Sequence, residues 1–200
     1  MRLLFLAAVV GGLEQGQSRR LFLRTAATTA LFLPMVSGAA DESEFNEMNV
    51  EGGGRVKIPA VWKRENGALS DPVLGLVTSS VVAHSLPCAA GDVGALGGKI
   101  DTFDLKKLGL KAPRERGDIV SAHVRRENDL VFYDWDLAVA PETCPKSQQL
   151  VVTTCLPDEV ALVSAVVKDG TLYVLECAVG PREWRNFAKA LRTMRNSFQV

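Results

Sequence analysis

The sequence has few of the residue types that build metal centres and catalytic sites. Its 200 residues include two histidines and four cysteines, and no two cysteines form a C-x-x-C pair. This scarcity argues against a zinc site, which is usually tetrahedral with Cys and His ligands. The G-x-S-x-G, H-E-x-x-H and phosphate-binding glycine motifs are absent too. Ser79, Ser80 and His84 are close in sequence only, so we expect a protein that is not an enzyme.

An excess of basic residues is also lacking. Lys and Arg together number 23, as do Asp and Glu, so the formal net charge is zero. Proteins that bind nucleic acid usually carry a strong basic excess on the binding domain. We therefore expect no nucleic-acid partner.

No apolar run reaches the roughly 20 residues that a membrane-spanning helix needs. The run at 25–36 has twelve residues and is interrupted by Pro34. A charged flank precedes it and small residues follow it, which is the order of a cleaved export signal. The flank 18–24, SRRLFLR, resembles the twin-arginine signal, although a general secretory signal with a chance arginine pair is the alternative. The predicted targeting residues, with cleavage after either alanine, are Arg19, Arg20, Phe22, Leu23, Ala39 and Ala40.

Residues 1–40 are therefore interpreted as a targeting segment. A second apolar run at 3–10 suggests an additional, outer targeting step, which the sequence leaves open. Cleavage removes four arginines and one glutamate, which leaves 19 basic and 22 acidic residues and a net charge of −3. The remaining chain, about 160 residues, is long enough for one domain with a single core. Within it, we expect a flexible, acidic and glycine-containing arm at 41–54 and a folded domain at 55–200.

Strand patterns recur through the folded domain. We expect strands at 55–59, within 73–83, at 119–124, at 130–140 and at 150–155, with Trp62 as a core anchor. The segment 87–98 is rich in glycine and predicts a loop. Asp101 and Asp104 before an apolar pair, with Gly109 after it, predict a short helix.

The strongest local signal is a hairpin formed by the apolar runs 160–167 and 172–179. Asp169-Gly170 between them favours a tight turn, which sets Lys168 opposite Thr171, Leu162 opposite Cys177 and Ser164 opposite Leu175. Both faces of this hairpin are then apolar. A sheet that is dry on both sides needs a cover above and below.

A helix from Pro181 can supply one cover. Trp184, Phe187, Ala188, Leu191 and Met194 recur on one helical face. The opposite face is basic and is either simply solvated or a docking surface. The candidate docking residues are Arg182, Arg185, Lys189 and Arg192.

The remaining candidates are cysteines and possible metal ligands. Register places Cys155 about 9.5 Å from Cys177, too far for a disulfide, so we expect two free thiols there. Cys88 and Cys144 both fall in loops and could pair. We expect no tightly bound cofactor. Weak calcium binding by exposed carboxylates is the alternative, and the candidate ligands are Asp134, Asp136 and His84.

These residues together resemble the PsbP family. The similarity rests on 167–174 (VKDGTLYV), on Ala178, Gly180 and Trp184, and on the closing Ser197-Phe198. Residues 56–59 (VKIP) with Trp62 resemble the family's opening strand, and 119–124 (IVSAHV) with Phe132-Tyr133 its central hairpin. The resemblance runs from about residue 55 to the end and is dense after 117. It departs from the family pattern at Glu159-Val160, where the family has an Arg-His pair.

The resemblance implies an α+β fold, a central antiparallel β-sheet flanked by helices on both faces, as in an α/β/α sandwich. It also implies a non-catalytic protein of the chloroplast thylakoid lumen, peripheral to the membrane and extrinsic to photosystem II. Its partners would be lumenal subunits of photosystem II at the oxygen-evolving complex. Family members can help to retain calcium and chloride there through a mobile N-terminal arm, but the arm here is short. The alternative is a transient assembly or repair factor of photosystem II or I.

Overall fold

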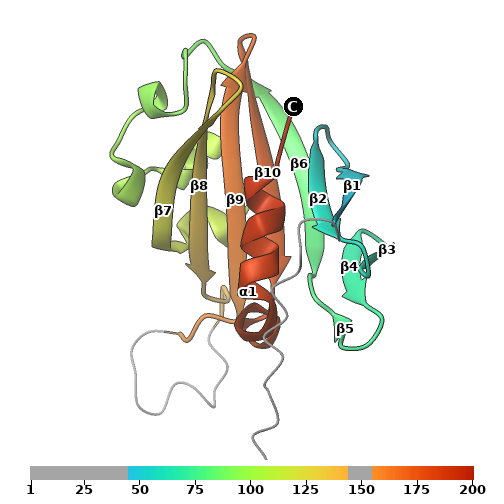
Figure 1. Cartoon of the computed structure of the whole chain (residues 1–200). Helices are drawn as coiled ribbons and strands as arrows, with labels where there is room; N and C mark the ends of the chain where they lie inside the picture. The colour runs from blue at the N-terminus through green and yellow to red at the C-terminus, as the bar shows by residue number, and fades with distance from the viewer. Residues whose placement is uncertain (1–44, 144–154) are drawn as a thin grey trace, which may run out of the picture. The chain divides into compact units, whose positions relative to one another are not determined.

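A five-stranded antiparallel sheet is the centre of the folded unit. The computed structural model describes residues 45–143 and 155–200. The strand order is β6-β10-β9-β8-β7, and every neighbouring pair is antiparallel (Figure 1). The strands are β6 (Ser80–Pro87), β7 (Asp118–Glu127), β8 (Leu130–Val139), β9 (Glu159–Lys168) and β10 (Thr171–Val179).

The predicted hairpin is β9 and β10, and its register is confirmed. Lys168 pairs with Thr171, Leu162 with Cys177 and Ser164 with Leu175. Asp169 and Gly170 both adopt positive φ, 50° and 72°, as the tight turn requires. The two predicted apolar faces are also confirmed, because alternate residues of each strand enter two separate core clusters.

The other neighbour of β9 differs from the prediction. It is β8, which pairs with β9 from Phe132↔Val166 to Val139↔Glu159, whereas the sequence favoured a strand at 150–155. Cys155 is not in a strand, and residues 150–154 lie outside the described residues. The expectation of a free thiol at Cys155 is wrong, since it is disulfide-bonded. Cys177 is free as expected; Cys88 is free too, so the considered pairing of Cys88 with Cys144 is wrong.

One face of the sheet, called the α1 face, is covered by α1 (Pro181–Asn196). Leu191 and Met194 are fully buried, and Trp184 and Phe187 pack against the same cluster. Trp62 is a core residue as predicted, with its ring edge-on to Phe187 at 5.8 Å between centroids. No helix among the described residues is long and apolar enough to cross a membrane.

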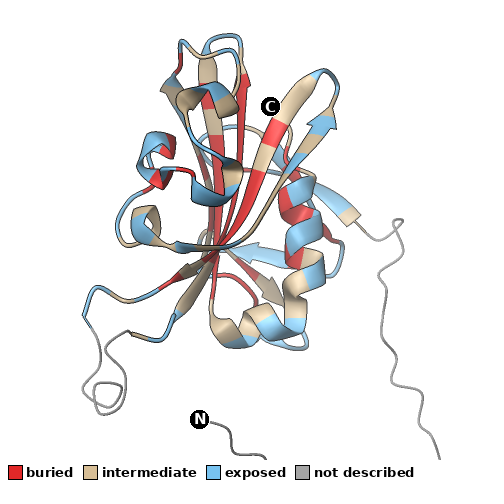
Figure 2. Cartoon of the chain, turned by 90° about the vertical axis from the view of Figure 1, so that its left-hand side faces the viewer, coloured by how far each residue is buried: buried red, intermediate tan, exposed pale blue. Residues whose placement is uncertain are grey.

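The opposite face, called the loop face, corrects the predicted fold class. No α-helix of the described chain covers it. Instead it is closed by the segment between β6 and β7, which carries short 3-10 helices (Figure 2). They are η2 (Gly94–Leu96), η3 (Ile100–Thr102), η4 (Leu105–Leu108) and η5 (Arg114–Arg116). The sheet is therefore flanked by an α-helix on one face only.

The predicted short helix at 101–109 is η4, and its limits follow from its caps. The side chain of Asp104 accepts a hydrogen bond from the Lys106 N–H, and Gly109 ends the turn in the left-handed region. Leu105 and Leu108 point into the loop-face core. A segment of four residues with good caps is long enough for a 3-10 turn but too short for a stable α-helix.

Two small sheets precede the large one. β1 (Phe45–Asn49) pairs with β2 (Arg55–Pro59), and β3 (Lys63–Glu65), β4 (Ala68–Asp71) and β5 (Gly75–Leu76) form a three-stranded sheet. The free edge of β2 also receives the C-terminal Gln199 through paired backbone hydrogen bonds with Arg55, of 2.9 and 3.0 Å.

The folded region starts earlier than predicted. Residues 45–49 of the expected flexible arm form β1, and Val50 is buried. The Glu51 carbonyl accepts a hydrogen bond from Ala83 in β6. These contacts show that this part of the expected arm belongs to the domain. Composition did not indicate it, because acidic residues surround the apolar Phe45, Met48 and Val50.

Candidate docking face and buried charge network

The outward face of α1 carries three cations that are free to meet a partner. Arg182, Arg185 and Lys189 are exposed, and no hydrogen bond or ion pair to another described residue engages their side chains. Their spacing of three and four residues puts them on one side of the helix, opposite the buried Leu191 and Met194. Together, Arg182, Arg185 and Lys189 are called the docking face.

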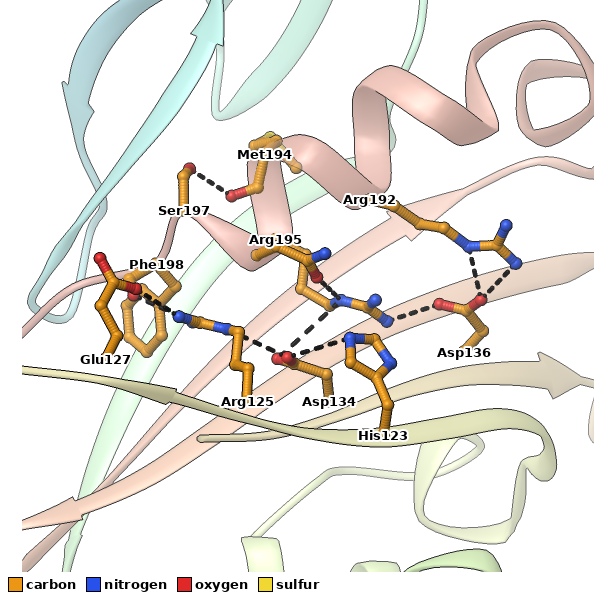
Figure 3. Close-up of polar contacts among 11 residues, drawn as sticks. His123, Arg125, Glu127, Asp134, Asp136, Arg192, Met194, Arg195, Ser197 and Phe198 are labelled. Carbon is orange, nitrogen blue, oxygen red and sulfur yellow. Dashed lines mark hydrogen bonds and ion pairs between the residues drawn. The ribbon is translucent and has the colours of Figure 1, made fainter. Parts of the chain in front are cut away.

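Arg192, the fourth predicted docking residue, is exposed as well, but its guanidinium is bound to a residue of the sheet. Its Nε and Nη2 donate to Oδ2 of Asp136 at 2.8 and 2.6 Å, and its guanidinium lies 4.8 Å from the centre of the Trp184 ring (Figure 3). Two charge-assisted hydrogen bonds from one guanidinium to the same buried carboxylate oxygen are strong and hold the side chain in place. Arg192 therefore belongs to the contact between helix and sheet rather than to the free basic surface.

Asp134 and Asp136 of β8 lie beneath the C-terminal half of α1. We predicted exposed carboxylates, but both are buried, at 0% and 1% exposure. Asp136 also accepts a 2.6 Å hydrogen bond from Arg195 Nη1, and Arg195 itself is 1% exposed. Burial lowers the pKa of Arg195, while Asp134 and Asp136 oppose that shift. The helix thus places two arginines on one aspartate.

Arg125 of β7 completes the network. It donates to Asp134 Oδ2 at 3.1 Å, to Glu127 at 2.7 Å and to the Phe198 carbonyl at 3.1 Å (Figure 3). His123 Nε2 lies 3.3 Å from the same Asp134 oxygen. Since Asp134 and Asp136 lie two residues apart on one strand, they meet cations from both α1 and β7. The contacts connect β7, β8, α1 and the C-terminal residues.

This arrangement does not suit a metal ion. Both carboxylates are already paired with arginines, so their negative charge is compensated. Asp134 Oδ1 accepts no hydrogen bond from the described residues, and its nearest charged neighbour among them is Arg195 Nε at 3.9 Å. Among residues 45–143 and 155–200, no group of three or more His, Cys, Asp or Glu side chains is placed to hold one. His84, the third candidate ligand, lies apart from both aspartates, on the loop face.

His84 belongs to a second polar cluster, between β6, β10 and the covering loop. Its Nε2 lies 2.8 Å from the Leu108 carbonyl and its Nδ1 3.3 Å from Glu176 Oε1. Arg114 of η5 contacts Glu176 at 3.3 Å and Glu159 at 2.7 Å. Both imidazole nitrogens face acceptors, so the ring makes both hydrogen bonds only when it is protonated.

Electrostatics of this cluster agree with that protonation. The hydrogen bond to Glu176 raises the pKa of His84, against an opposing effect of burial and of Lys111. Burial alone would raise the pKa of Glu176, but hydrogen bonds from His84 and Arg114 outweigh it and the net shift is downward. The hydrogen bond to Glu159 raises the pKa of Arg114. Two cations therefore balance two carboxylates when His84 is charged.

The departure from the PsbP pattern at Glu159-Val160 has a structural role here. Glu159 forms the ion pair with Arg114, and Val160 packs against the α1-face core. Glu159 and Val160 therefore make structural contacts in this chain and do not form a basic surface.

Other candidate residues have simple positions. The Ser79 hydroxyl donates to the Ala178 carbonyl at 2.9 Å, so Ser79 and His84 do not contact each other as nucleophile and base. The targeting residues Arg19, Arg20, Phe22, Leu23, Ala39 and Ala40 lie outside the described residues.

Sequence reasoning missed Arg195, Arg125, Arg114 and Glu176 as network residues. A signal existed for Arg195, since it stands four residues after Leu191 and so on the apolar side of α1. An arginine at such a position predicts a buried acidic partner. The alternation of side chains along β8 also indicated that the two aspartates are buried, because Asp134 and Asp136 share a face with the buried Phe132.

Comparison with known proteins supports the architecture. No protein-family model matches the sequence, and no curated protein matches it. The structure is similar to the solution structure of cyanobacterial PsbP (CyanoP) from Synechocystis sp. PCC 6803, with 15% sequence identity and a TM-score of 0.50. The match covers 82% of this chain and 96% of that chain. The chain therefore has a PsbP-like fold.

Proposed function

We propose that this chain is a non-catalytic protein of the thylakoid lumen that docks on the lumenal side of photosystem II. The observation that carries the proposal is the PsbP-like fold, which spans 96% of the cyanobacterial protein. The export signal predicted at 1–40 supports it as well, because the twin-arginine route that it resembles moves folded cargo across the thylakoid membrane. Fold and signal are separate features of the chain, and both favour the same compartment.

The docking face of α1 supplies the contact. Arg182, Arg185 and Lys189 form a positively charged surface on a chain whose predicted mature net charge is negative. Exposed charges of this kind steer encounter with an acidic partner and contribute modestly to affinity. The partner surface is therefore expected to be acidic, and the association to weaken as salt rises.

We further propose that the chain holds no tight cofactor. Asp134 and Asp136 are neutralised by Arg125, Arg192 and Arg195, so calcium would have to displace arginines from buried carboxylates. Any contribution to calcium or chloride retention would come from covering a site on the partner, not from ligands of this chain.

A salt wash of isolated thylakoid membranes tests the proposal. We expect release of the protein together with loss of oxygen evolution, and recovery of both when the mature protein is added back. Release without loss of oxygen evolution would contradict the extrinsic-subunit proposal and favour the assembly factor instead.

Variants locate the contact. Replacing Arg182 and Arg185 by Gln should weaken rebinding several-fold at low salt, because two steering charges are removed. Lys99→Gln with Arg126→Gln removes the same charge from exposed residues elsewhere and should rebind like wild type. Equal rebinding of the two double variants would exclude α1 as the docking face.

A further inference from the structure

The exposed apolar residues of the described chain are concentrated in one place. Seven large apolar side chains are strongly exposed, and four of them belong to the small region around β3, β4 and β5. They are Val61 at 59%, Val73 at 86%, Leu74 at 67% and Leu76 at 56% exposure. Contiguous exposed apolar residues usually mark an interaction site. These four residues are called the apolar tip.

Strand register places the apolar tip at one end of the three-stranded sheet. Lys63 pairs with Ser70, and Ser70 pairs with Leu76. The turn between β4 and β5, which holds Val73 and Leu74, therefore lies at the end of the sheet where β3 begins. Val61 lies at this end too, because it precedes Lys63 by two residues. The turn is fixed by Asp71, whose Oδ1 accepts hydrogen bonds from the N–H groups of Val73 and Leu74 at 2.8 and 2.9 Å. The two most exposed side chains are thus held outward by a defined turn.

A buried base supports the apolar tip. Leu69 of β4 is fully buried, and Trp62, next to Val61, packs on Phe187 of α1. Through that contact the tip is attached to the helix that carries the docking face, and Figure 1 shows β5 and the first turn of α1 at the same end of the five-stranded sheet. The tip is therefore a rigid projection and not a frayed loop.

Shape and charge indicate the kind of surface that the tip would meet. Side chains that are 67% and 86% exposed project outward and would need a matching groove on a protein partner, whereas a lipid interface deforms around any projection. Exposed cations stand beside it, Lys63 on β3 and both Arg182 and Arg185 on the neighbouring helix. Arg64, also on β3, is already paired with Glu51 at 3.8 Å and donates to the Asn49 carbonyl at 3.1 Å. Apolar side chains with nearby lysine and arginine are the combination that binds anionic lipid surfaces.

We propose that the apolar tip inserts shallowly into a lipid bilayer that carries anionic lipids. This inference goes beyond docking on photosystem II, which requires no lipid contact. Few side chains enter the bilayer, so binding should be weak and reversible, and it should orient the domain against the membrane.

Vesicle co-sedimentation tests the inference. The protein is residues 41–200, which contain every described element, and the vesicles are phosphatidylcholine alone or an equal mixture with phosphatidylglycerol. We expect co-sedimentation with the mixed vesicles and several-fold less with phosphatidylcholine alone. If the protein binds neither kind of vesicle, the inference is overturned. Equal binding to both kinds would overturn the claim that anionic lipids are required.

Paired variants assign the contact to the apolar tip. Val73→Ser with Leu74→Ser should lower the vesicle partition coefficient by about tenfold, because two apolar side chains no longer enter the interface. Val120→Ser with Val124→Ser changes two exposed valines of β7 and should bind like wild type. Equal loss in both variants, with unchanged thermal midpoints, would overturn the assignment. The vesicles contain no protein, so this failure would leave docking on photosystem II untouched.

Discussion

At the scale of the residue, the most informative feature is the number of buried charges. Asp134, Asp136 and Arg195 are almost fully buried, yet each lies beside a partner of opposite charge. Such pairs add little net stability compared with an apolar core, but removal of one partner leaves the other charge buried and alone. The network therefore specifies how α1 sits on the sheet.

Arg195→Met should accordingly destabilise the domain by about 1–3 kcal/mol, because Asp136 loses one of its two arginine partners and keeps Arg192. Urea denaturation followed by circular dichroism measures the change in unfolding free energy. Arg185→Met, on the exposed side of the same helix, is the control and should change it by less than about 0.5 kcal/mol. A similar effect of the two substitutions would contradict the assigned network.

His84 should make stability depend on pH. Its pKa is raised in the folded state through Glu176, so its contribution is complete below the ordinary value of 6.5 and is lost as pH rises through the folded value. Stability should therefore decline as pH rises from 6.5 through the higher folded-state pKa of His84. Glu176 acts in a separate, acidic window, because its lowered pKa contributes above the ordinary value of 4.5 and is lost below it.

The matched variants for this prediction are His84→Gln and His123→Gln, each compared with wild type by denaturation across the pH range. The first should flatten the decline because the titrating ring is gone. The second removes the other histidine, leaves the contacts of His84 intact, and should keep the decline. An unchanged slope in His84→Gln would show that another group is responsible.

At the scale of the element, features close together in the sequence were predicted well, whereas strand pairings between distant segments were not. The Asp169-Gly170 turn determined the register of β9 and β10 and both core faces, because a two-residue turn leaves one pairing. The aromatic stripe of α1 was equally clear from its spacing. The sequence could not show that β8 lies beside β9, because long-range pairing depends on the whole sheet.

The cover of the loop face was predicted incorrectly for a physical reason. A two-sided apolar sheet demands burial, but it does not demand a helix. Leu105, Leu108, Phe103 and Val93 supply that burial from capped turns. Asp134 and Asp136 were taken as exposed because carboxylates usually are, and the helix arginines that pair with Asp136 lie 56 and 59 residues away in sequence.

The N-terminal segment offers an element-scale prediction with a close control. A Cβ on Gly52 would lie 1.7 Å from the Ala83 carbonyl oxygen, whereas a Cβ on Gly53 would meet nothing within 4 Å. Both glycines have positive φ, so both alanine variants carry backbone strain. Gly52→Ala should also detach 45–52 from β6 and be more destabilising than Gly53→Ala by about 1–3 kcal/mol.

Hydrogen exchange at Ala83, whose N–H donates to Glu51, measures that detachment. We expect faster exchange in Gly52→Ala than in Gly53→Ala. Equal exchange in both variants would contradict the assignment of this segment to the folded domain and would restore the flexible arm predicted from composition.

At the scale of the whole molecule, a PsbP-like fold is retained at 15% identity to the cyanobacterial protein. In this chain the fold rests on a pattern of burial: two apolar sheet faces, a covering helix and the buried aromatic residue Phe198 near the end. The charged residues beneath α1 and at Glu159 fit this chain's own packing. The exposed cations of α1 and the apolar tip remain as the surfaces through which the molecule can meet others.

Co-migration of the mature protein on a native gel of solubilised thylakoid membranes tests the central claim, docking on photosystem II, most directly. We expect the protein in the band of photosystem II, with much less of it there when Arg182 and Arg185 are replaced by Gln. Migration with photosystem I alone, or only as free protein at low salt, would contradict the claim.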